Sequence, residues 1–153
     1  MILIVDTREQ LPFSFNKWPE VQVQRAALST GDYSLLGLEH KIALERKSID
    51  DLVGCLMGQD RERFERELAR GTALDRFAVV VEDSFENFSY GRYRSKMKPH
   101  AALQSLFAFQ IRYGTNFIFA YNRAGAEYTV YSLLQKYLAE LEKAYKAMQE
   151  AVA

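Results

Sequence analysis

The chain has 153 residues, of which 48% are hydrophobic and 13% aromatic, enough apolar material for the core of one ordinary domain. Its 20 basic residues balance its 20 acidic residues, so no overall positive field indicates binding to nucleic acid, and any such footprint has to be local. The single cysteine, Cys55, excludes an internal disulfide and a cysteine-based zinc site, and its apolar helical surroundings favour a small buried side chain.

The N-terminal residues carry no targeting signal. The segment MILIVDTREQ lacks the basic region and the long apolar stretch of a signal peptide, and no apolar run in the chain is long enough to cross a bilayer. We therefore expect a soluble, cytoplasmic protein whose gene product begins at Met1. No repeat, low-complexity tract or linker interrupts the chain, so residues 1–153 are expected to form a single domain.

The first third of the chain has the pattern of strands. Residues 1–6 form a short apolar run, residues 21–28 begin with period-two alternation, and residues 32–36 and 41–47 follow each other at hairpin distance. Ser48 then occupies a helix N-cap position, since apolar residues recur after it at helical spacing, at Ile49, Leu52, Val53 and Leu56.

Helices and strands alternate in the rest of the chain. A charged helix is predicted over residues 59–71, and residues 76–83 follow as a strand buried on both faces. Pro99 suits the first turn of a helix that runs to Gly114, and residues 115–122 have the pattern of a further strand. From about Tyr128 an amphipathic helix is expected, with its apolar stripe at Val130, Leu134, Tyr137, Leu138, Leu141, Ala144, Tyr145 and Met148. This order of elements predicts a three-layer α/β fold.

Two acidic residues are expected to meet on neighbouring strands. If GLEH, residues 37–40, is a tight hairpin connection, Leu36 lies opposite Lys41 and Asp32 lies opposite Glu45. Directly opposed carboxylates repel each other, and a hard divalent cation such as magnesium would turn that repulsion into coordination. Lys47 shares a strand face with Glu45 and is expected beside the same site.

A third acid, Asp6, ends the first predicted strand, where open α/β sheets usually carry ligand groups. Carboxylates with a nearby lysine suit phosphodiester hydrolysis, because a metal ion activates water and stabilises the attacking and leaving oxygens. Lys47 could hold that water or offset charge in the transition state. Any one of these acids alone is more often a solvated carboxylate at a strand end, and it is their convergence that favours a site.

The segments VDTRE, GDY and ERKSIDD together resemble the nuclease domain of the XPF-type structure-selective endonucleases, whose signature is GD followed by ERK-x-x-x-D. The residues that fill the signature positions are Gly31, Asp32, Glu45, Arg46, Lys47 and Asp51, and Asp6 matches the acid of the family's first strand. The resemblance extends over the helix containing Arg63, the strand with Glu82 and the elements after Pro99, and so spans nearly the whole chain.

This resemblance implies a restriction-endonuclease-like fold of the PD-(D/E)xK type, with a central mixed sheet of about six strands flanked by helices. It implies Mg²⁺ as cofactor, with Mn²⁺ able to substitute, and cleavage of DNA that leaves a 5′-phosphate and a 3′-hydroxyl. Asp6, Asp32 and Glu45 would then be metal ligands with the Arg46 carbonyl, and Asp32, Glu45 and Lys47 the catalytic residues.

Several further residues near the motif have two possible roles. Asp51 is explained by a capping box with Ser48, and it also fills the last signature position. Arg8, Glu9, Arg46 and Arg63 could contact DNA phosphate or form ion pairs that hold the acids, and the sequence does not divide these options.

Two charged segments differ in character. In QDRERFERELARG, arginines alternate with acids at helical spacing, which predicts a solvated helix face laced by ion pairs. In YGRYRSKMKPH, basic residues come without any acid, and the interleaved tyrosines could stack on an unpaired base. We expect this second segment to contact DNA, or else to be a solvated loop, through Arg92, Arg94, Lys96 and Lys98.

The leading interpretation is a metal-dependent DNA endonuclease that cuts branched or flap DNA in repair, recombination or phage DNA processing. The alternatives are a non-catalytic DNA-binding or dimerisation subunit with the nuclease fold, and a junction resolvase or restriction-type nuclease. Related domains carry helix-hairpin-helix or helicase regions, and we expect neither within residues 1–153. They also dimerise, so a homodimer or heterodimer is possible, with the C-terminal stripe packed either on the domain's own core or on a second subunit.

Overall fold

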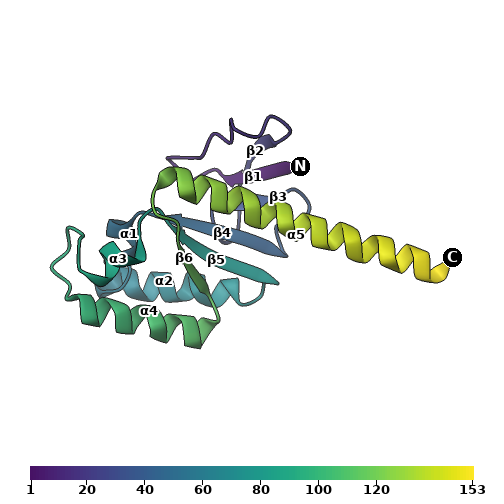
Figure 1. Ribbon diagram of the computed structural model, residues 1–153. Helices are drawn as coiled ribbons and strands as arrows, with labels where there is room; N and C mark the ends of the chain where they lie inside the picture. Colours follow the sequence, from purple (N-terminus) through teal and green to yellow (C-terminus); the bar gives the residue numbers. More distant parts are fainter.

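The computed structural model describes residues 1–153 and is built on a six-stranded sheet in the order β2-β1-β3-β4-β5-β6 (Figure 1). The strands are β1 (Ile2–Asp6), β2 (Gln22–Ala26), β3 (Tyr33–Leu35), β4 (Ile42–Lys47), β5 (Arg76–Val81) and β6 (Asn116–Phe119). Strand β1 runs parallel to β2 and antiparallel to β3, β3 and β4 form an antiparallel hairpin, and β4, β5 and β6 are parallel. The predicted mixed sheet of about six strands is therefore confirmed.

Five helices flank this sheet. They are α1 (Ile49–Gly54), α2 (Gly58–Gly71), α3 (Phe85–Ser89), α4 (Pro99–Tyr113) and α5 (Arg123–Val152). The short α3 was not predicted, and α5 begins at Arg123 rather than near Tyr128, because the Asn122 side chain caps it by accepting a hydrogen bond from the Gly125 amide at 2.8 Å. No helix has both the length and the apolar character that a membrane span requires.

The two faces of the sheet bury separate cores, which makes the three predicted layers. Helices α1 to α4 pack on one face, and α5 crosses the other (Figure 1). Strand β5 shows the alternation most clearly, since Val79 and Val81 belong to the first core and Val80 to the second. Each fully buried valine contributes about 1.5–3 kcal/mol relative to an exposed one. The prediction that this strand is buried on both faces is confirmed.

Helix α5 packs on the sheet along only part of its length. Its N-terminal half buries Ala126, Val130 and Leu134, whereas its C-terminal half extends past the sheet (Figure 1). Apolar residues on this projecting half are exposed, and Met148 is 66% accessible. The stripe therefore packs on the domain's own core near its start and leaves the core beyond Leu138.

The β3–β4 connection differs from the tight turn predicted. Residues 36–41 form a wider loop, in which Gly37 has a φ of +82° and the Leu36 amide donates to the Ile2 carbonyl of β1 at 3.1 Å. Leu36 consequently pairs with β1 rather than with Lys41, and that part of the prediction was wrong. The predicted register nevertheless holds in the ladder, where Tyr33 lies opposite Leu44.

Candidate active site

Gly31 brings Asp32 against the middle of β4. Its φ is +78°, and a Cβ at this position would lie 2.9 Å from the Ala43 Cβ, so the close approach of the chain requires glycine. The Asp32 amide donates to the Leu44 carbonyl at 2.8 Å, and the Asp32 carboxylate accepts from the Arg46 amide at 2.8 Å. Because its partners are the residues on either side of Glu45, Asp32 lies beside Glu45, as predicted.

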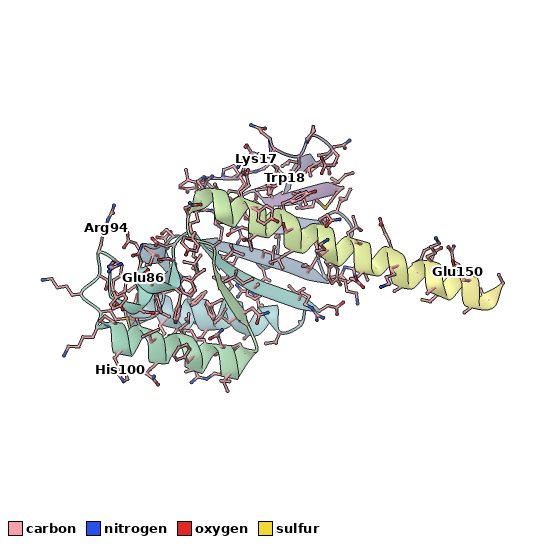
Figure 2. All side chains as sticks on the ribbon, in the orientation of Figure 1. Lys17, Trp18, Glu86, Arg94, His100 and Glu150 are labelled. Carbon is pink, nitrogen blue, oxygen red and sulfur yellow. The ribbon has the colours of Figure 1, made fainter.

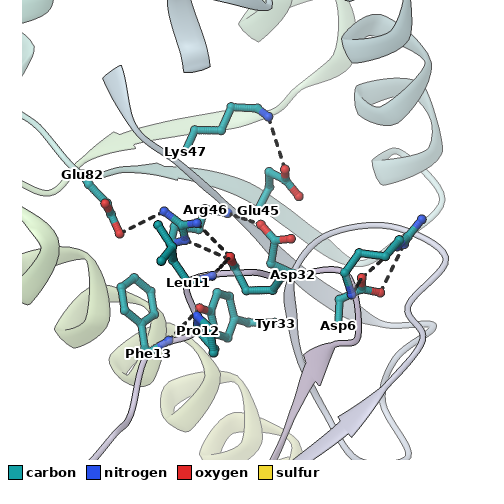
Figure 3. Close-up of polar contacts among 12 residues, drawn as sticks. Asp6, Leu11, Pro12, Phe13, Asp32, Tyr33, Glu45, Arg46, Lys47 and Glu82 are labelled. Carbon is teal, nitrogen blue, oxygen red and sulfur yellow. Dashed lines mark hydrogen bonds and ion pairs between the residues drawn. The ribbon is translucent and has the colours of Figure 1, made fainter. Parts of the chain in front are cut away.

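Glu45 and Lys47 share one face of β4, also as predicted. The Lys47 ammonium donates to a Glu45 carboxylate oxygen at 3.3 Å (Figure 3). It also lies 5.0 Å from the centre of the Phe64 ring. The Glu45 and Lys47 side chains are only 13% and 12% exposed, so this pair is largely shielded from solvent. Lys47 is the only lysine or arginine paired with Glu45.

Burial makes this pair of carboxyls costly to ionise. It raises the pKa of Asp32 to about 6, against the opposing effect of the Arg46 amide. The pKa of Glu45 is raised as well, first by burial and then by the negative charges of Glu67 and Asp32. Burial lowers the pKa of Lys47, but its neighbours, Glu45 first and then Cys55 and Glu67, together raise it more, so Lys47 is held as a cation.

Glu67 is a third carboxyl at this site that sequence reasoning missed. Apart from Arg63, the charged residues of α2 were predicted to form a solvated face with internal ion pairs, and only two such pairs form within the helix, the closer at 3.7 Å between Arg63 and Asp60. Glu67 instead faces the cavity of Asp32 and Glu45. Its spacing of three residues from the buried Phe64 was the available signal, because it places Glu67 beside the buried stripe of the helix.

Asp6 is buried but already fully bonded within the protein. Its carboxylate accepts from the Arg8 guanidinium at 2.8 and 3.1 Å and from the Leu28 amide at 2.7 Å. Burial raises the pKa of Asp6, but these donors lower it further, so the carboxyl is ionised. Figure 3 shows Asp6 to one side of Asp32 and Glu45.

The acids fit a hard cation unevenly. Asp32 and Glu45 present adjacent carboxylate oxygens with few protein donors, which suits magnesium or manganese. Asp6 would have to release hydrogen bonds to join them, and no three His, Cys, Asp or Glu side chains converge as a ready-made metal site. The metal-binding roles of Asp6, Asp32, Glu45 and the Arg46 carbonyl stay predictions.

The Arg46 side chain points away from these acids into a buried ion network. Its guanidinium forms two 2.8 Å hydrogen bonds with the Glu9 carboxylate and lies 3.3 Å from Glu82 (Figure 3). Arg123, at the start of α5, bonds to the same Glu82 at 2.9 Å and to the Leu11 carbonyl at 2.7 Å. Of the two roles left open for Arg46 and Glu9, the structure shows the ion pair.

The region after β4 carries the predicted helix cap. The Ser48 hydroxyl accepts from the Asp51 amide at 3.1 Å, so Ser48 is confirmed as the N-cap. The reciprocal bond of a capping box, from the Ser48 amide to the Asp51 carboxylate, does not form, and the exposed Asp51 side chain lines the cavity of the site. Its neighbour Asp50 ties down the basic segment, because it accepts from the Arg94 amide at 2.9 Å.

The segment Tyr90–Lys98 lies between α3 and α4, and from Gly91 onward its residues alternate between half-buried and exposed. Tyr93 and Met97 pack on the core, and the Tyr93 hydroxyl donates to the Met97 carbonyl at 2.7 Å, so stacking of Tyr93 on a base is not supported. The basic side chains all face solvent, and Figure 2 shows Arg94 pointing outward from the loop. These exposed residues are Arg92, Arg94, Lys96 and Lys98.

One cavity of about 560 Å³ gathers the predicted catalytic residues from separate segments. Asp32, Glu45 and Lys47 line it, together with Arg8 and Glu67. Buried carboxyls and an ammonium held by Glu45 thus lie together in a hollow on a mixed six-stranded sheet.

The chain belongs to the ERCC4 domain family, whose model matches residues 5–133. No curated protein matches the chain. Among solved structures, it is similar to XPF from Aeropyrum pernix, with a TM-score of 0.70 and 24% identity over 88% of this chain and 60% of that chain. It is also similar to XPF from Aeropyrum pernix in complex with DNA, with a TM-score of 0.69 and 23% identity over 91% and 66%. The chain therefore spans less than two thirds of either relative, and the likeness shows the shared fold.

Proposed function

We propose that this domain is a divalent-metal-dependent DNA endonuclease that hydrolyses phosphodiester bonds in branched or flap DNA, in repair, recombination or phage DNA processing. The observation that carries the proposal is the buried pair Asp32 and Glu45, two carboxyls side by side whose one direct ion pair with a lysine or arginine is that between Glu45 and Lys47. Such a pair is electrostatically unfavourable on its own and becomes favourable when a cation binds.

In this proposal Asp32 and Glu45 hold Mg²⁺, or Mn²⁺ in its place, with Asp6 and the Arg46 carbonyl as further candidate ligands. The bound ion would supply an activated water and charge neutralisation at the phosphate. Lys47 would hold its ammonium against the developing negative charge, since Glu45 and the Phe64 ring fix its position. The Arg46 network would keep β4 and the loop after β1 in place.

DNA is the proposed polymer because the family match and the solved relative in complex with DNA support it. The solvent-facing segment from Arg92 to Lys98 is the proposed contact with phosphates outside the cavity. Replacing its four basic residues by glutamine should weaken binding and flatten the salt dependence, by roughly 0.9 in log–log slope for each duplex phosphate that is no longer neutralised. A titration series between low and physiological salt measures this, and an unchanged slope would return the segment to a solvated loop.

A second subunit is the other proposed partner. The exposed C-terminal half of α5 supports it, because Leu141, Tyr145 and Met148 lie along one face without a covering element. Light scattering over a concentration series tests the proposal. A constant monomer mass would contradict pairing of two copies, and a second subunit of a different kind would then need to be sought by co-purification.

The deciding experiment is cleavage of a DNA panel containing a flap, a fork, a four-way junction, a single strand and a plain duplex. With Mg²⁺ or Mn²⁺ the protein should cut one or more branched forms, and EDTA should stop the reaction. Glu45→Gln, which keeps the shape of the side chain, serves as the inactive control. Cleavage in EDTA would sink the metal-dependent mechanism. Binding without cleavage in any metal would favour the non-catalytic subunit, and preferential cutting of the four-way junction would favour the resolvase.

A further inference from the structure

A second cavity, of about 230 Å³, lies next to the proposed catalytic cavity. The residues that line both are Arg8, Asp32, Glu45, Arg63 and Glu67. Beyond this shared boundary, the second cavity is formed by the turn before Asp32 and by the far end of α2. Its own residues are Asp6, Ser29, Thr30, Gly31 and Arg70.

Three arginines surround this second cavity. Arg63 and Arg70 project from the same face of α2 as Glu67, at a spacing of seven residues, and Arg8 comes from the loop after β1. The Arg8 and Arg63 side chains are 72% and 78% exposed, whereas the Glu45 side chain is 13% exposed. The carboxyls therefore form the floor, and the cationic side chains form the mouth.

Only part of this positive charge is used within the protein. Arg8 is committed to Asp6, and Arg70 donates one hydrogen bond to the Thr30 hydroxyl at 3.3 Å. Arg63 has a single ion pair, at 3.7 Å, with the largely exposed Asp60. An exposed pair of this kind contributes less than about 1 kcal/mol, so it leaves Arg63 free to meet a ligand.

We propose that this second cavity, the arginine pocket (Arg8, Ser29, Thr30, Arg63 and Arg70), binds the DNA phosphate adjacent to the one that is cut. Planar guanidinium groups match phosphate oxygens in geometry as well as charge, and the Ser29 and Thr30 hydroxyls add neutral donors. Since the two cavities share a boundary at Asp32 and Glu45, a strand with its scissile phosphate there carries its neighbour into the arginine pocket. This inference rests on the proposed function and deepens it.

The arginine pocket would position the DNA strand and would take no direct part in bond cleavage. A carboxyl floor repels phosphate, so a strand needs a cationic contact nearby to hold the scissile bond over the floor. Fixing the neighbouring phosphate supplies that contact and sets which bond is presented. Arg63 and Arg70 are in this sense positioning residues.

The first test is equilibrium binding of a DNA that the protein cuts, or of a flap DNA if none is cut, measured in EDTA so that no reaction is required. The variant Arg63→Gln/Arg70→Gln is compared with Arg66→Gln, which removes the same kind of charge from the same helix but at a residue outside both cavities. The double variant should bind about tenfold more weakly, and its log–log salt slope should fall by roughly 0.7–0.9, the value for one neutralised phosphate. Arg66→Gln should leave both quantities within error of wild type.

The second test neutralises single phosphates of the DNA by methylphosphonate substitution, scanned along the bound strand. One substitution should weaken wild-type binding about tenfold and have little further effect on the double variant, because both changes remove the same interaction. Losses that add fully at every position, or equal behaviour of the double variant and Arg66→Gln, would overturn the proposal. Failure of catalysis alone would count against the proposed function and leave these binding results interpretable.

Discussion

The two faces of β4 differ in how their buried charged side chains are paired. On one face, Glu45 and Asp32 lie together, and their one direct ion pair with a lysine or arginine is that between Glu45 and Lys47. On the other face, Arg46 is bonded twice to Glu9 and lies close to Glu82. Glu45 and Arg46 are neighbours in one strand, yet Glu45 belongs to a cluster with more carboxylates than paired cations, and Arg46 belongs to a cluster in which the charges are paired.

The difference separates a binding site from a scaffold. A buried ion pair with good hydrogen bonds is complete in the folded chain and gains nothing from a ligand. Buried carboxyls that repel each other store a free energy that only protonation or a bound cation can recover. The sign of the stability change on removing a charge should therefore differ between the two faces.

The largest effect is expected from Arg46→Met, which keeps the length of the side chain and removes its charge. Glu9, whose side chain is 4% exposed, would lose its cationic partner. We expect the free energy of unfolding to fall by roughly 3–5 kcal/mol, the usual cost of breaking a buried ion pair. Urea unfolding monitored by circular dichroism measures it. The control is Arg76→Met at the exposed start of β5, expected within about 0.5 kcal/mol of wild type. A cost for Arg46→Met as small as the control would mean that this network is not a scaffold.

Lys47→Ala tests the other face through turnover. Loss of the ammonium should lower kcat by about 10²–10³-fold, the usual cost of removing one donor that stabilises developing charge, with DNA affinity nearly unchanged. Single-turnover cleavage and a binding titration separate the two quantities. Lys41→Ala, an exposed lysine just before β4, is the matched control. If kcat were unchanged, Lys47 would have no part in the reaction.

The smallest effect is expected from Asp32→Asn in metal-free protein, where the predicted change is a gain in stability rather than a loss. Removing one of two facing carboxylates should raise stability by about 0.5–1 kcal/mol. Asp6→Asn should instead lower stability by roughly 1–3 kcal/mol, because Asp6 loses charge-assisted bonds from Arg8.

Calorimetry in EDTA measures both variants, and millimolar Mg²⁺ should then raise the melting temperature of wild type far more than that of Asp32→Asn. A destabilised Asp32→Asn protein in EDTA, or equal Mg²⁺-induced shifts, would contradict a repulsive cation-binding pair.

Sequence reasoning was reliable where the information is local. Strand alternation placed Glu45 and Lys47 on one face, and the hairpin register placed Asp32 beside them although the turn itself was wrong. Glu67 was missed because its approach depends on how α2 packs across the sheet. Whether the Arg46 side chain binds DNA phosphate or a protein carboxylate could not be predicted either, because Glu9 and Glu82 approach it only in the folded chain.

The projecting half of α5 has a consequence for amide exchange. A helix of about a dozen residues is marginal in water when nothing packs against it. Glu150 lies on this projecting end in Figure 2. Amide protons beyond residue 140 should therefore exchange with deuterium through local fraying, within seconds, while those of Val79 and Val80 wait for global unfolding. Slow exchange along this half would indicate that a second molecule covers it, and the protected amides would show which turns of the helix are covered.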